Sequence, residues 1–178
     1  MGTFRSRFPT RLELFQAYAV CVFLIQIWSI YNVLRAVPSW ALAMDTWTLV
    51  GTIAYTQAFA LVESMIILAL LVLLAFVLPG KVYRDRFVAQ SSVMLILAAA
   101  GAILAHFKGA ELGIWSARGF LVWLIILLGL IGLASLILAR FNGLCKGIES
   151  LAERMQVLAT VYIVIGILSV LVVIIRNV

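Results

Sequence analysis

The sequence has little charge for its length, and this limits the kind of protein it encodes. Only 11% of its 178 residues are charged and 66% are hydrophobic, whereas a soluble domain carries roughly 25% charged residues. The composition excludes a water-soluble domain. The chain also lacks long polar tracts and Pro- or Ser-rich linkers. We therefore expect a single transmembrane domain over residues 1–178, with no soluble catalytic module attached.

Residues that form metal and catalytic sites are scarce as well. The chain has one histidine, His106, and two cysteines, Cys21 and Cys145, which form no CxxC or Cys/His pair. One histidine and one intramembrane glutamate are too few ligands for a metal site. The sequence contains no glycine-rich phosphate loop and no convincing Ser/His/Asp set. We expect no metal, no cofactor and no catalytic residue, and the interpretation leans away from an enzyme.

What the sequence does contain is a series of apolar runs, each long enough to cross a bilayer core. They predict an all-α fold, a polytopic helical bundle with five transmembrane helices at about 12–37, 49–78, 87–107, 119–139 and 155–175. The apolar core of the first run is too long for a signal peptide, so we expect an uncleaved helix. Asp45 is expected to cap the second helix. Residues 143–155 are either an amphipathic surface helix or an extension of the fifth span.

The basic residues are distributed unevenly between the two ends of these spans. Nine of the 13 Lys and Arg residues fall on the side that includes the N-terminus, and four fall on the other side. The positive-inside rule then predicts a cytoplasmic N-terminus and an external C-terminus, in a multi-pass protein of the cell (cytoplasmic or inner) membrane. The net charge of +6 lies in short loops, so we expect contacts with the lipid bilayer and no nucleic acid.

One acidic residue interrupts the apolar pattern. Glu63 lies within the second predicted span, and a helical repeat places Thr56 and Thr52 on the same face. At about 1.5 Å of rise per residue, Gln26 and His106 reach a level similar to that of Glu63, toward the outer side. These five residues predict a polar pocket that opens outward.

Two further groups are candidates for binding and packing. Arg35, Lys108 and Arg118 fall slightly further out than Glu63 and are candidate contacts for an anionic lipid headgroup. The third span carries a stripe of small residues, which in membranes lets helices approach closely. The predicted packing stripe consists of Ala98, Gly101, Ala102 and Ala105.

Three functions fit these features. The favoured one is a non-enzymatic helical-bundle subunit that packs against or stabilises another membrane protein, or forms a homo-oligomer. The first alternative is a transporter or channel component in which Glu63 binds a proton or cation. The second is a lipid-headgroup-binding protein or membrane-embedded enzyme at the outer leaflet, with Glu63 as base and His106 beside the three basic residues.

Overall fold

The computed structural model describes residues 9–77, 83 and 86–177, all of them helical or in short connections between helices. The end of the second predicted span at residue 78 lies outside this part, as do Arg5, Arg7, Lys81 and Arg84, which contribute to the charge bias. The described helices are α1 (Arg11–Ala43), α2 (Thr46–Val77), α4 (Phe87–Lys108), α5 (Ala117–Arg140) and α6 (Asn142–Asn177). All five are long and apolar enough to span a membrane, which supports a multi-pass membrane protein.

Short polar signals set several helix boundaries. A capping box starts α1: the Glu13 amide donates to Thr10 Oγ1 at 3.3 Å, and the Thr10 amide donates to the Glu13 carboxylate at 2.6 Å. Asp45 accepts from the Thr48 amide at 3.0 Å, which confirms the predicted cap before α2. Ser116 caps α5 by accepting from the Gly119 amide at 3.0 Å.

Two helices extend well beyond their predicted spans, by six residues or more. α1 continues beyond residue 37, through Pro38, to Ala43, so residues 38–43 belong to the same helix as the first span. α6 runs without a break from Asn142, so residues 143–155 extend the fifth span and do not form a separate surface helix.

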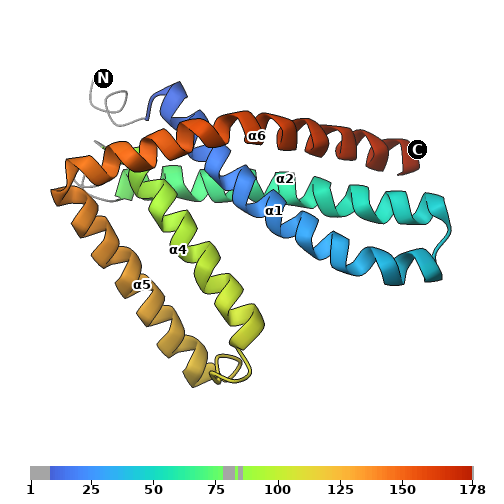
Figure 1. Cartoon of the computed structure of the whole chain (residues 1–178), viewed down its shortest axis with the longest axis horizontal. Coiled ribbons are helices and arrows are strands. Elements are labelled where there is room, and N and C mark those ends of the chain that lie inside the picture. The colour runs from blue at the N-terminus through green and yellow to red at the C-terminus, as the bar shows by residue number, and fades with distance from the viewer. Residues whose placement is uncertain (1–8, 78–82, 84–85, 178) are drawn as a thin grey trace.

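The helices form two arms that diverge from one end (Figure 1). α1, α2 and α6 lie along one another and make the three-helix arm, while α4 and α5 make a hairpin arm. The arms meet at the junction end, where α1, α4 and α6 begin and α2 and α5 finish. At the opposite, splayed end, the α4–α5 turn lies far from the α1–α2 turn.

The junction end holds most of the buried side chains. Val20 of α1, Val88 of α4 and Ala152 of α6 form one buried cluster. Ala17, Ala75, Tyr83 and Phe87 form another, and Ala89, Leu138 and Cys145 a third. The Tyr83 hydroxyl lies 3.1 Å from Ser91 Oγ, and burial raises the pKa of this phenol. All five helices therefore contribute to the packing at this end.

α6 packs against the other helices through a narrow stripe of small residues. Its buried residues are Cys145, Ala152, Ala159, Gly166 and Ser169. The first four recur every seven residues, the spacing of a helix that keeps one seam against its neighbours. At Gly166 an added Cβ would lie 3.1 Å from the Leu61 side chain of α2, so α2 and α6 approach closely there.

Arg86 joins the start of α4 to the α5–α6 corner. Its guanidinium donates to the Leu138 carbonyl and to the Asn142 side chain, and it lies 3.4 Å from Cys145 Sγ. The carbonyl belongs to the last turn of α5, where backbone acceptors lack helical partners and a cation is favourable. Arg86 is thus one of the basic residues behind the predicted topology, and it also holds α4, α5 and α6 together.

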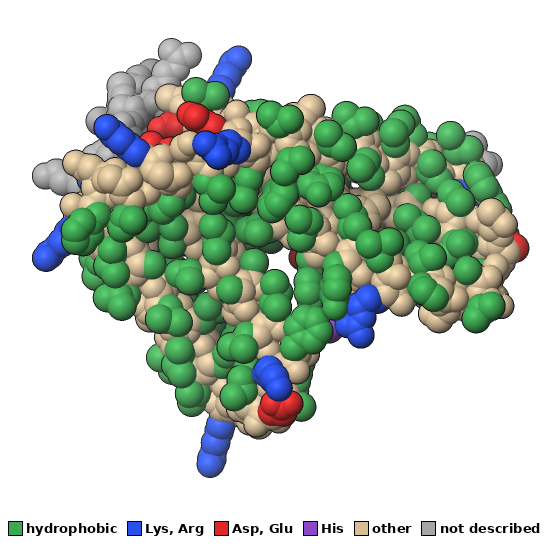
Figure 2. All heavy atoms as spheres, in the orientation of Figure 1, with side chains coloured by type: hydrophobic (Ala, Val, Ile, Leu, Met, Phe, Trp, Pro, Cys, Tyr) green, Lys and Arg blue, Asp and Glu red, His purple; other side chains and the backbone are tan. Residues whose placement is uncertain are grey.

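The surface has the pattern expected of a chain surrounded by lipid. Figure 2 shows hydrophobic side chains over both arms, with charged ones mostly near the junction end and the tip of the hairpin arm. At about 1.5 Å per residue the helices of the three-helix arm are roughly 50 Å long, which exceeds a hydrocarbon core of about 30 Å. They can fit a bilayer by tilting and by extending beyond it.

Candidate functional site

Three residues predicted to share a face line one groove between α1 and α2. Thr52, Thr56 and Glu63 border this groove, which has a volume of about 540 Å³. α1 supplies the opposite wall with Ser29 and Asn32. The groove begins near the splayed end of the three-helix arm and extends to Glu63, and we call it the polar groove.

The two threonine hydroxyl groups of the polar groove are hydrogen-bonded to their own helix. Thr52 Oγ1 donates to the Thr48 carbonyl and Thr56 Oγ1 donates to the Thr52 carbonyl, each at 2.9 Å. Such back-bonding satisfies a threonine in an apolar helix and leaves its oxygen lone pairs able to accept a hydrogen bond. The α2 wall of the groove thus offers two threonine oxygens as acceptors, with the Glu63 carboxylate at its inner limit.

Beyond Glu63 the surroundings become apolar. A second gap, of about 370 Å³, lies between the arms and is bordered by Glu63 and Ile67 of α2, by Cys21 and Leu24 of α1, and by α4. Figure 2 shows an opening between the arms. Glu63 belongs to the walls of both spaces, so it marks the boundary between polar and apolar surroundings.

Glu63 is exposed on the surface of the chain, and no described residue forms a hydrogen bond or ion pair with it. Four apolar residues on the same side of α2 are also exposed: Phe59, Val62, Ile66 and Leu70. Together these five residues form what we call the α2 face. It has the helical spacing of a surface that meets lipid or another helix.

Glu63 also lies close to the middle of its helix. At about 1.5 Å of rise per residue it is roughly 25 Å from the Thr46 end of α2 and roughly 21 Å from the Val77 end. A charged side chain at the centre of a membrane-spanning helix costs about 3 kcal/mol on insertion scales. The sequence-based prediction placed Glu63 nearer the outer surface, because its depth was counted only from the C-terminal end of the second span.

The other two residues of the predicted pocket lie elsewhere. Gln26 is fully buried in α1, and neither polar atom of its side chain has a described partner. His106 is exposed at the end of α4 and packs edge-on against Trp28, with 5.3 Å between ring centroids. Trp28 lines both spaces beside Glu63, so His106 approaches the site through this ring and not through a contact with the carboxylate.

The three basic residues predicted to hold a headgroup are not gathered into one site. Lys108 forms an ion pair with Glu111 at 2.8 Å, in the α4–α5 turn. Arg118 lies in the first turn of α5, at the same tip. Arg35 lies over the Tyr31 ring in the three-helix arm, with 5.6 Å from its Cζ to the ring centroid.

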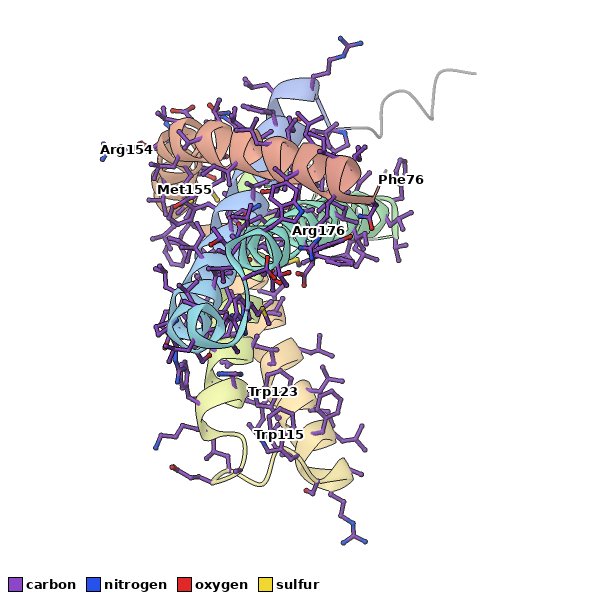
Figure 3. The ribbon with its side chains drawn as sticks, turned by 90° about the vertical axis from the view of Figure 1, so that its right-hand side faces the viewer. Phe76, Trp115, Trp123, Arg154, Met155 and Arg176 are labelled. Carbon is purple, nitrogen blue, oxygen red and sulfur yellow. The ribbon has the colours of Figure 1, made fainter. Side chains whose placement is uncertain are left out.

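The small residues of α4 divide between two sides of the helix. At Gly101 an added Cβ would meet the Leu127 side chain at 2.9 Å and Trp123 at 3.3 Å, so α4 and α5 approach closely there. Figure 3 shows Trp123 and Trp115 within the hairpin arm. Ala98 and Ala102 border the gap between the arms, and Ala105 is only partly buried.

Comparisons with protein-family models, curated proteins and solved structures give no match to this chain. The function of the chain is therefore inferred from the geometry of its described residues. Among the described residues, no group of three or more His, Cys, Asp or Glu side chains is close enough to hold a metal ion.

Sequence reasoning missed part of the site. Trp28 fits an aromatic belt at the membrane surface by its position in the sequence, but its ring forms a wall of both spaces. Ser29 and Asn32 also line the polar groove. The sequence does indicate that Trp28 and Asn32 share a helix face, because they are four residues apart in α1. Only the pairing of α1 with α2 shows which face meets Glu63.

Proposed function

We propose that this protein is a non-enzymatic membrane subunit that packs against a second membrane protein through the α2 face. The observation that carries the proposal is Glu63, a carboxylate near the middle of a membrane-length helix, exposed and without a described partner. Exposed apolar residues alone would not support it, since lipid covers them as well as protein does. A lipid-exposed carboxylate is costly, and a partner that supplies a hydrogen-bond donor would offset that cost.

We propose the orientation and membrane from the charge pattern. By sequence, nine of the 13 basic residues belong to the side that includes the N-terminus, and the five of them that the structure describes are Arg11, Arg86, Arg140, Lys146 and Arg154, in or beside the helix ends that meet at the junction end. The positive-inside rule favours a cytoplasmic junction end, an external splayed end and a location in the cell membrane. The polar groove then opens outward.

Site-specific photocross-linking in native membranes tests the proposal. A benzophenone amino acid at Val62, beside Glu63, should give one discrete adduct with a second protein. The matched control is the same amino acid at Ile125, which is 68% exposed on α5 and distant from Glu63 in the sequence. Equal adducts from both positions, or none from Val62, would contradict the proposal.

A second candidate function is supported by the polar groove. Acceptor oxygens of Thr52 and Thr56 lead to Glu63, as a proton or cation path would require. Against it, the space on the other side of Glu63 is apolar, so the described part of the chain offers no continuation. Reconstituted vesicles would show a proton or cation flux that Glu63→Gln abolishes. The exposed Glu153 provides the control, Glu153→Gln; an unchanged flux in Glu63→Gln would exclude Glu63 as the coupling group.

A further inference from the structure

The described part of the chain supplies no partner for Glu63, and the register of the helices limits what an external partner can be. Gly166 of α6 packs against Leu61 of α2. Arg176 of α6 donates to the Thr48 carbonyl at 3.3 Å, and Figure 3 shows Arg176 reaching from α6 toward α2. These contacts give the relative levels of charged residues along the three-helix arm.

No described lysine or arginine of the chain lies at the level of Glu63, and His106, which is closer to that level, packs against Trp28 and has no described contact with the carboxylate. Since Gly166 lies beside Leu61, Arg154 is about ten residues, or roughly 15 Å, closer to the junction end than Glu63. On the other side, Gln57 Nε2 donates to Ser29 Oγ at 3.1 Å, which fixes the pairing of α1 with α2. By that pairing Arg35 is roughly 20 Å closer to the splayed end than Glu63.

A second copy of the chain does not solve this problem. Two copies with the same topology sit at the same depth in the membrane, so they bring no described lysine or arginine to the level of Glu63. Pairing through their α2 faces would bring Glu63 close to its own equivalent, and two like charges repel.

A lipid amine is also a poor match. Glu63 is roughly 21–25 Å from either end of α2, whereas lipid headgroups lie at the membrane surface. A basic side chain carried near the middle of a membrane-spanning helix can reach this level. That side chain would itself be costly in hydrocarbon, so pairing offsets the cost of both groups.

Resting on the proposed function, we infer that the partner contributes a transmembrane helix with a lysine or arginine near its midpoint, and that this side chain pairs with Glu63 at the α2 face. The apolar residues around Glu63 contact the body of that helix. The gap of about 370 Å³ beside Glu63 gives a long basic side chain room to enter between the arms.

Synthetic transmembrane peptides test the pairing without knowledge of the partner. The labelled full-length protein is reconstituted in phosphatidylcholine vesicles, and energy transfer reports binding of Leu/Ala peptides with Lys, Gln or Leu at the centre. A fourth peptide carries its lysine near one end. We expect the central-Lys peptide to bind about tenfold tighter than the other three. Glu63→Gln should remove this preference and Glu153→Gln should leave it intact.

Three results would overturn the inference. Equal binding of the Lys and Leu peptides would show that charge plays no part, and equal binding of the Lys and Gln peptides would show that a neutral donor suffices. Loss of the Lys preference when phosphatidylethanolamine is added would identify a lipid amine as the occupant. In each case a Val62 adduct in native membranes would still stand, whereas the absence of that adduct would remove the proposed function itself.

Discussion

The junction end of the molecule and the region around Glu63 differ in how closely their helices pack. At the junction end, all five helices bury side chains against one another, and Arg86 bonds α4 to the α5–α6 corner. Away from the junction end, the hairpin arm departs from the three-helix arm, and Glu63, near the middle of α2, borders the space between them. The junction end holds the fold together, while the region around Glu63 has an unmet requirement for a partner. Substitutions should therefore affect stability at the junction end and association around Glu63.

The largest expected effect comes from overpacking the junction end. Ala152 is 1% exposed between Val20 and Val88. Ala152→Leu forces extra methylene groups into that cluster and should lower the free energy of unfolding by about 3 kcal/mol. Ala102→Leu, which adds the same atoms beside the gap between the arms, should cost less than about 0.5 kcal/mol. Steric trapping in bilayers measures both, and equal losses would erase the difference between the two regions.

A smaller loss is expected when the arginine of the junction end becomes lysine. Arg86→Lys keeps the charge, and hence the topology signal, but cannot donate to both Leu138 and Asn142 in the same way. We expect unfolding to become easier by about 1–2 kcal/mol. Arg154→Lys is the control, because Arg154 is exposed and has no described partner. If both changes leave stability unaltered, Arg86 acts only through its charge.

Glycine substitutions probe the packing within the hairpin arm. At Gly129 nothing lies within 4 Å of an added Cβ, whereas at Gly101 it would meet Leu127 at 2.9 Å. Gly129→Ala should stabilise α5 by up to about 1 kcal/mol, since alanine favours the helix. Gly101→Ala should gain less or lose stability, because Leu127 must move. Thermal unfolding of the two variants compares them, and a larger gain at Gly101 would contradict the close α4–α5 contact.

The smallest effect concerns the cap of α2 at the splayed end. Hydrogen bonds from the Thr48 side chain and backbone hold the pKa of Asp45 below its usual value of 3.8. A lowered pKa means that the ionised cap stabilises the helix start above pH 3.8 and that this contribution is lost as the pH falls through the folded-state value. Thr48→Val removes the larger cause, so carboxyl NMR should show the Asp45 midpoint move upward. An unchanged midpoint would mean that the side-chain bond is absent.

The helices themselves could be predicted well from the sequence. Every predicted span lies within a helix over the described residues. The length and polarity of the apolar runs decide this, and both are local properties of the chain. The extension of α1 through Pro38 was missed, because a proline inside an apolar run usually marks the end of a helix.

The candidate site could be predicted only along one helix. Thr52, Thr56 and Glu63 share a face of α2 by periodicity, and the structure places all three along one groove. Gln26 and His106 were assigned by depth, and depth does not say which way a side chain points: Gln26 is buried in the bundle and His106 lies on Trp28. The small residues that recur every seven positions in α6 are visible in the sequence. The prediction considered only the stripe of small residues in α4.

Glu63 has no partner within the described part of its own chain, and the unfolding free energy of the isolated protein tests this most directly. Glu63→Leu, measured by steric trapping in phosphatidylcholine bilayers, should leave that free energy unchanged or raise it, because the substitution removes an uncompensated carboxylate from an apolar face. A loss of more than about 1 kcal/mol would show that Glu63 already forms a stabilising contact inside the chain, and would contradict the account.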